Sequence, residues 1–205
     1  MTTQPTSPSG AKRPRQFTLA ERMKLFPLDF EVHLDRNGKA AITVRENWER
    51  QNLVRIGPFD GANQLVFSPR VHITAANVFS VFLFAVEKDP LSNVDTYNDI
   101  LTYDGGYVPR LKRGVEIPLA GSPKSAYEAK LSNHSRGTAI DLNAAWNAMG
   151  KPGAAEGQKG YLGRIIAIAD TIRVKQDGME LGIVCGAHWK GASIDPMHFE
   201  IGVWV

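Results

Sequence analysis

The last nine residues of the chain, 197–205, alternate strictly between two kinds of side chain. Successive side chains of a β-strand point to opposite faces, so this segment is expected to be a strand with two distinct faces. One face is entirely apolar: Met197, Phe199, Ile201, Val203 and Val205. The other face holds His198, Glu200, Gly202 and Trp204. The apolar face is complete without His198, so we expect the His198 side chain to point away from it.

Three other segments are expected to be helices. Thr18 and Glu21 have the spacing of a capping box, which predicts a short helix that ends at Leu25. Residues 73–88 carry an apolar stripe at helical spacing. Residues 162–175 repeat isoleucines at a similar spacing and predict the third helix.

Short alternating runs predict several further strands. Asn37-Gly38 lies between the runs 30–34 and 40–44, and Asn-Gly in that position is a strong hairpin signal. Other strands are expected at 52–56, 64–67, 100–103 and 138–143, whereas 105–133 and 146–160 are expected to be loops. Helices and mostly adjacent strands in mixed order favour an α+β fold, in which helices pack on an antiparallel sheet.

The net positive charge of the chain is accounted for by its first 16 residues. Residues 1–16 contain Lys12, Arg13 and Arg15 and no acid, so this segment carries a charge of +3. That value equals the net charge of all 205 residues. Their composition predicts a disordered basic tail, followed by a single domain over residues 17–205. The tail is either a solvated arm or a segment attracted to an anionic envelope. The rest of the chain is balanced in charge, which gives no support to a nucleic-acid partner.

Membrane and export signals bear on where the protein is made. No apolar run is long enough to span a membrane, and the first residues lack the apolar region of a secretory signal. We therefore expect a protein that is made in the cytoplasm. We also expect it to be a monomer. The single cysteine, Cys185, has apolar neighbours and is expected to be a buried thiol, not a nucleophile.

The segment 132–141 supplies a histidine and a carboxylate that could join His198. Gly137 permits a sharp turn, so His134 can fold back towards Asp141. Two imidazole nitrogens and one carboxylate oxygen suit zinc, with a fourth position left for water. On spacing alone, a chance arrangement without a metal remains open.

Asp195 is a candidate for the proton-transfer step at such a site. It lies three residues before His198, next to Pro196 and outside the expected strand. From there it could accept a proton from a zinc-activated water and pass the proton to a leaving amine. The His-Glu-x-x-His helix of other zinc peptidases is absent, so this site would be built on strands and loops.

Two motifs carry a family resemblance. Ser-x-His-x-x-Gly-x-Ala-x-Asp at 132–141 and Asp-x-Met-His-Phe-Glu at 195–200 resemble the motifs of the D-alanyl-D-alanine carboxypeptidase family of zinc metallopeptidases. The likeness extends upstream to 102–110 and covers about residues 100–205. The family includes vancomycin-resistance dipeptidases and phage endolysins that cut L-alanyl-D-glutamate bonds. The resemblance implies a hedgehog/DD-peptidase-like fold.

The resemblance also implies roles for particular residues. His134, Asp141 and His198 are implied as ligands of Zn²⁺, and Asp195 as the general base. Arg110 matches the arginine that lies near the scissile carbonyl in the family, where it would stabilise the developing oxyanion. A surface ion pair is the alternative role for Arg110.

Four more residues are candidates for contact with the substrate or with a ligand. Ser132 matches the motif serine and would bind substrate, orient the loop or cap it. Trp189 would wall the substrate pocket or pack on the surface, and Tyr107 is a candidate for substrate binding. Glu200 could orient a zinc ligand from behind. Many relatives have glutamate in place of Asp195, although endolysin-type relatives also use aspartate, so the subgroup is open.

Three hypotheses about function follow. The first is a zinc peptidase that acts on peptidoglycan stem peptides, at the terminal D-alanyl-D-alanine bond or at an internal L,D bond. A phage endolysin, or a protein exported by another route, would reconcile a wall substrate with the missing signal. The second is a non-catalytic zinc module that recognises a surface, and the third is a metal-free structural domain. The intact base position at Asp195 argues against the second.

Overall fold

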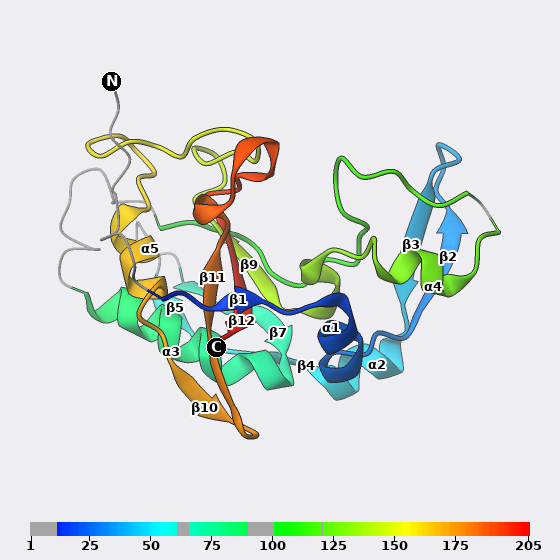
Figure 1. Cartoon of the computed structure of the whole chain (residues 1–205), viewed down its shortest axis with the longest axis horizontal. Helices are drawn as coiled ribbons and strands as arrows, with labels where there is room; N and C mark the ends of the chain where they lie inside the picture. Colours follow the sequence, from blue (N-terminus) through cyan, green and yellow to red (C-terminus); the bar gives the residue numbers. More distant parts are fainter. Residues whose placement is uncertain (1–11, 61–65, 90–100, 120) are drawn as a thin grey trace.

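The computed structural model describes residues 12–60, 66–89, 101–119 and 121–205. Its centre is an antiparallel sheet with the strand order β10-β11-β12-β9-β8 (Figure 1). In that order the strands are Val174–Gln176, Met179–Cys185, His198–Val203, Ala139–Leu142 and Tyr103–Gly105. The segment that alternates in the sequence is therefore β12, and it lies between β11 and β9 in the middle of the sheet.

A short N-terminal strand, β1 (Arg15–Gln16), completes the sheet beside β12. β9 pairs with His198 to Glu200 of β12, and β1 pairs further along, with Gly202 and Val203. Residues 15 and 16 form a strand, which corrects the prediction that residues 1–16 are disordered throughout. Residues 1–11 lie outside the described part of the chain. Backbone groups of β12 beyond the end of β9 need hydrogen-bond partners, and β1 supplies them.

Two helices pack against the main sheet, α3 (Ile73–Lys88) and α5 (Gly163–Ala169). The buried core between these elements includes Val78, Phe79 and Phe82 of α3, Ile183 of β11, and Phe199 and Ile201 of β12. The rings of Phe82 and Phe199 have centroids 5.3 Å apart. The apolar face of β12 thus packs on helices, as its alternation predicts.

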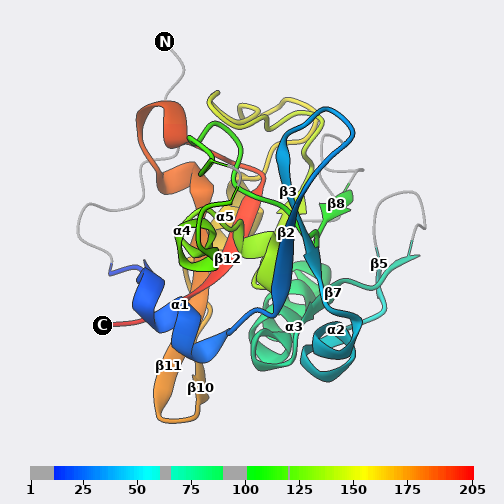
Figure 2. The ribbon, with the colours of Figure 1, turned by 90° about the vertical axis from the view of Figure 1, so that its right-hand side faces the viewer.

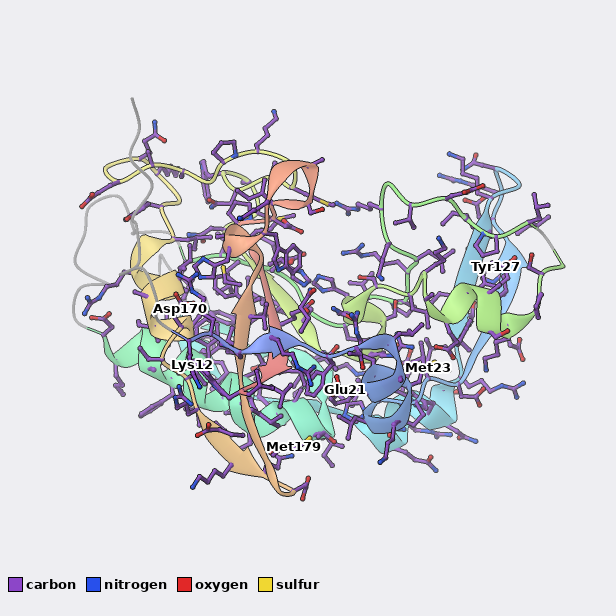
Figure 3. The ribbon with its side chains drawn as sticks, viewed as in Figure 1. Lys12, Glu21, Met23, Tyr127, Asp170 and Met179 are labelled. Carbon is purple, nitrogen blue, oxygen red and sulfur yellow. The ribbon has the colours of Figure 1, made fainter. Side chains whose placement is uncertain are left out.

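A second, smaller hydrophobic cluster lies at the other end of the molecule from α5 (Figure 1). It is built from the hairpin of β2 (Phe30–Leu34) and β3 (Ala40–Val44), with α2 (Glu46–Asn52) and α4 (Lys124–Glu128). Figure 2, turned so that this end faces the viewer, shows the hairpin in front of the main sheet. Tyr127 of α4 points into this cluster (Figure 3) and is fully buried.

Several predicted elements are confirmed. α1 (Leu19–Leu25) begins with a complete capping box, in which the side chains of Thr18 and Glu21 each accept a hydrogen bond from the backbone N–H of the other residue. The hairpin and the α3 helix have the predicted bounds. The strand predicted at 52–56 is β4 (Leu53–Arg55), and the one predicted at 64–67 is β6 (Val66–Phe67), with residues 64 and 65 outside the described residues. Their antiparallel partners, β7 (Arg70–His72) and β5 (Phe59–Asp60), were not predicted. The fold is α+β with antiparallel sheets.

Other elements were predicted wrongly or were missed. The helix predicted over 162–175 ends at Ala169, and β10 occupies its last residues. β11, α2 and α4 were not predicted. The strand predicted at 100–103 begins at Tyr103, and residue 100 lies outside the described residues. None of the helices in the described residues is long and apolar enough to cross a membrane.

Candidate metal centre

Three side chains from two strands and a short helix meet at one point. The register of β9 and β12 pairs His198 directly with Asp141, which sets their side chains side by side on one face of the sheet. His134 comes from the 3-10 helix η2 (Asn133–Arg136), which immediately precedes β9. Together they form a group of His and Asp side chains that could hold a metal ion.

The loop before β9 has the turn that brings His134 back towards the sheet. Ser132 caps η2, and its side chain accepts a hydrogen bond from the backbone N–H of His134. Gly137 ends η2 with φ at +68°, a left-handed conformation that favours glycine. A Cβ at this position would lie 2.7 Å from the backbone nitrogen of His72, so the turn is also tightly packed.

The three inward-facing atoms form a nearly equilateral triangle. The distance from His134 Nε2 to His198 Nδ1 is 3.2 Å. Asp141 Oδ1 is 3.2 Å from each of those two nitrogens. A tetrahedral zinc with bonds of about 2.1 Å holds neighbouring ligand atoms about 3.4 Å apart. The donor set and its spacing therefore fit zinc.

The outward-facing ring nitrogens of both histidines already have partners. His134 Nδ1 lies 2.8 Å from the carbonyl oxygen of Gly106, which can only accept, so this nitrogen carries the proton. His198 Nε2 lies 2.9 Å from Glu200 Oε2. These contacts aim His134 Nε2 and His198 Nδ1 at the centre of the triangle, as is usual for metal-binding histidines.

The electrostatics of the cluster favour ionised groups. Burial opposes ionisation of Asp141, but hydrogen bonds from the two histidines outweigh it and hold the pKa of Asp141 well below its usual range. Burial also disfavours a charged His198, yet Asp141 and Glu200 together raise the pKa of His198 to about 10. A metal that binds at His198 Nδ1 would replace the proton that a charged imidazole carries on that nitrogen.

Asp195 lies in the loop just before β12 and is buried. Desolvation raises the pKa of Asp195, and the negative charge of Asp141 adds to that effect. The Oδ1 atom of Asp195 has no hydrogen-bond partner among the residues that the structure describes. Gly186 packs on the Asp195 backbone, since a Cβ at Gly186 would overlap the Asp195 carbonyl oxygen. A buried carboxylate oxygen of this kind is suited to a ligand or a reacting group.

Arg110 lies within electrostatic reach of the triangle. Its backbone is held by Ser135, whose hydroxyl accepts from the Arg110 N–H at 2.8 Å and donates to the Arg110 carbonyl at 2.6 Å. Burial lowers the pKa of Arg110, with a further contribution from Arg113, while the charges of Asp141 and Asp195 act in the opposite direction. The guanidinium is therefore a half-buried cation that feels both carboxylates.

The three residues predicted to contact substrate have different surroundings. The ring of Trp189 packs against His198, with centroids 5.4 Å apart, so Trp189 lies beside the triangle. Ser132 is buried as the cap of η2. Tyr107 belongs to the edge of the second hydrophobic cluster, where its hydroxyl donates to Glu49 at 2.6 Å.

Some supporting residues were missed from the sequence. Gln16 and Asn133 both donate hydrogen bonds to Glu200, the carboxylate behind His198. Asn133 stands inside the 132–141 motif, and its position next to His134 was the available signal. Gln16 stands in the segment predicted to be disordered, and no local pattern pointed to it.

Comparison with known proteins supports the same part of the chain. A family model described as D-alanyl-D-alanine carboxypeptidase matches residues 126–201, which confirms the resemblance inferred from the two motifs. The matched segment contains the triangle and Asp195, whereas Arg110 lies upstream of it. Neither a curated protein nor a solved structure matches the chain.

Proposed function

Because residues 126–201 match the D-alanyl-D-alanine carboxypeptidase family, we propose that this chain is a zinc-dependent peptidase that hydrolyses peptidoglycan stem peptides. The observation that carries the proposal is the triangle of His134, Asp141 and His198, with equal sides of 3.2 Å and both outer ring nitrogens engaged. We also propose that the fold is of the hedgehog/DD-peptidase type.

The triangle is the proposed zinc site, with one atom from each of the three residues as ligand. Zinc, when bound, supplies Lewis-acid chemistry that activates a water nucleophile and polarises a carbonyl. The protein's part is to hold the three donors in place and to keep their tautomers fixed through Gly106 and Glu200.

Asp195 is the proposed general base and then the general acid. Its desolvated carboxylate would accept a proton from the attacking water and donate it to the amine nitrogen that leaves when the peptide bond breaks. The buried Oδ1, which has no partner among the described residues, is the atom best suited to hold that proton. The raised pKa of Asp195 makes the carboxyl a better proton acceptor than an exposed aspartate.

Arg110 is the proposed partner of the negative charge that develops on the carbonyl oxygen. The charges of Asp141 and Asp195 act on its guanidinium, which supports a position at the same site. Trp189 is proposed to form one wall for the substrate. Ser132 and Tyr107 are proposed substrate contacts; in the structure Ser132 caps η2 and the Tyr107 hydroxyl donates to Glu49.

The substrate class follows from the family. Stem peptides offer either a terminal D-alanyl-D-alanine bond or an internal L,D bond, and both remain candidates. The proposed place of action is the cell wall, reached as a phage lysis enzyme or by export. We propose that residues 17–205 form one domain and that the protein acts as a monomer.

The experiment that tests the proposal is digestion of purified peptidoglycan by the zinc-loaded protein and by an Asp195→Ala variant. Released fragments are identified by mass spectrometry. We expect new termini at one type of peptide bond with the wild type, and almost none with the variant. Equal release by both proteins would overturn the role of Asp195. Stoichiometric zinc without any cleavage would favour a binding module instead.

A further inference from the structure

The carboxylate of Glu200 is enclosed by hydrogen-bond donors. It lies two residues after His198 on β12 and is almost completely buried. Its Oε2 atom faces His198 Nε2 at 2.9 Å and also accepts from the side-chain amide of Asn133. Its Oε1 atom accepts from Gln16 Nε2 at 2.8 Å. A buried carboxylate needs such partners to stay ionised.

Gln16 reaches this carboxylate from β1, far away in the sequence. The pairing of Gln16 with Gly202 sets its position beside β12, two residues beyond Glu200. Gln16 lies outside the segment matched by the family model. The residue is solvent-exposed overall, and only its amide end reaches the buried carboxylate. Replacing it therefore removes a hydrogen bond without opening the hydrophobic core.

The other amide donor is held by the same N-terminal part of the chain. Arg22 of α1 donates to Asn133 Oδ1 at 2.8 Å, which leaves the Asn133 amide nitrogen to face Glu200. Arg22 also donates to the Phe17 carbonyl at 2.9 Å, one residue after Gln16. Both supports of Glu200 thus depend on residues 16–22.

We propose that Gln16 is a positioning residue for the metal centre. It fixes Glu200 as the acceptor for His198 Nε2–H, so that His198 presents Nδ1 to the centre. The inference rests on the proposed function for the identity of the metal, but it concerns a contact that is independent of the reaction. A partner in direct contact with a metal ligand, as Glu200 is with His198, typically contributes about 10-fold to 100-fold in metal affinity, and Gln16 acts through that partner.

The test compares Gln16→Met with a matched control, Arg15→Met. Both replace an exposed residue of the same short strand, but Arg15 pairs with Glu21 and not with Glu200. Zinc dissociation constants are measured by competition with a chromophoric chelator. We expect binding to weaken about 10-fold in Gln16→Met and to be unchanged in Arg15→Met. Unchanged binding in both variants would overturn the inference.

A second readout separates positioning from simple loss of stability. In zinc-loaded protein, long-range proton–nitrogen NMR detects the His198 Nε2–H, and we expect its exchange with water to be faster in Gln16→Met alone. The thermal unfolding of the metal-free variants should be similar. Weaker zinc binding with an unaltered His198 signal would also overturn the inference.

A double variant tests the route through Glu200. Combining Gln16→Met with Glu200→Gln should weaken zinc binding no more than Glu200→Gln alone, because Gln16 acts only through that carboxylate. Additive losses would contradict this route. A wild type that binds no zinc would instead refute the proposed function, so the two failures are distinguishable.

Discussion

Asp195 has the environment expected of the proton carrier that we propose for this centre. Its carboxyl group is buried, has an oxygen without a partner among the described residues, and has a raised pKa. Asp141, by contrast, is held ionised by the two histidines. Two carboxylates in one site with opposite pKa shifts are suited to different tasks, one as a ligand and one as an acid–base group.

Replacing Asp195 by asparagine should separate binding from chemistry. The Asp195→Asn substitution keeps the size of the side chain but removes its ability to carry a proton, so we expect turnover to fall by about 10²–10⁴-fold. Zinc stoichiometry should stay at the wild-type value, because Asp195 is not part of the triangle. Both are measured on the same preparation, by metal analysis and by peptide cleavage. Loss of zinc together with activity would contradict the assignment.

We expect His72 to give the stability of the fold a pH dependence. It is buried, its Nδ1 accepts from the Thr74 N–H, and its Nε2 has no partner among the described residues. Burial lowers the pKa of His72 from 6.5 to about 4. Above pH 6.5 the ring is neutral in both the folded and the unfolded state. As the pH falls from 6.5 to about 4, only the unfolded chain takes up the proton, so stability is lost.

The loss assigned to His72 is on the order of 3 kcal/mol at pH 4. Asparagine at this position keeps an acceptor for the helix cap and removes the titration. We therefore expect His72→Asn to be less stable at pH 7 but to lose less of its free energy of unfolding down to pH 4. Denaturant unfolding at several pH values measures both. Parallel curves for the two proteins would exclude His72 as the cause.

At the scale of elements, Gly137 forms the turn that connects η2 to β9. Alanine there would need a left-handed backbone and would bring its Cβ to 2.7 Å from the His72 nitrogen. We expect Gly137→Ala to cost about 2–4 kcal/mol of stability and to weaken metal binding by shifting His134. Gly178 is a matched control, with φ at +76° but nothing within 4 Å of its Cβ position.

Gly178→Ala should therefore cost only the backbone strain, about 1 kcal/mol, and leave metal binding unaltered. Urea unfolding and zinc titration of the two variants provide the comparison. Equal effects of the two substitutions on zinc binding would mean that packing around Gly137 does not position the centre.

The elements that could be predicted from the sequence are those with a local cause. The capping box of α1 and the Asn-Gly hairpin are specified by neighbouring residues. The helix predicted over 162–175 is present only as far as Ala169; its C-terminal part was wrong because the residues at its end pair with β11, and this tertiary pairing outweighs helical periodicity. A local signal was overlooked there: Asp177 and Gly178 both have positive φ and form the two-residue turn between β10 and β11.

The same distinction applies to the site. His134, Asp141 and His198 lie in two short motifs, so their grouping could be predicted. The support of Glu200 by Gln16 joins residues 184 positions apart and depends on the pairing of β1 with β12. No pattern within residues 1–16 specifies that pairing, so it could be found only in the structure.

At the scale of the whole molecule, Arg136 connects the two hydrophobic clusters. It is 1 % exposed, donates to the Phe26 carbonyl at 3.1 Å, and pairs with Glu128 at 2.6 Å. Phe26 belongs to the main cluster, while Glu128 is on α4 beside Tyr127 of the second. Arg136 also ends η2, next to the turn at Gly137.

Removing the charge of Arg136 should destabilise the molecule strongly. Arg136→Met leaves Glu128 without its buried partner, and we expect a loss of about 3–5 kcal/mol. Adding Glu128→Leu should recover much of this lost stability, because the unpaired charge is then gone.

The exposed pair of Arg50 and Glu46 is the control, where Arg50→Met should cost under about 1 kcal/mol. Chemical denaturation of the wild type and the three variants measures these losses; equal losses at both pairs would contradict the bridging role.

The central claim is that one zinc ion at His134, Asp141 and His198 enables this chain to cleave stem peptides. The most direct measurement is a zinc titration of the metal-free protein, followed by the rate at which new amino termini appear from a defined stem peptide. We predict that the rate rises linearly and levels off at one zinc per chain. Full activity before any metal is added, or no activity at any zinc concentration, would contradict the claim.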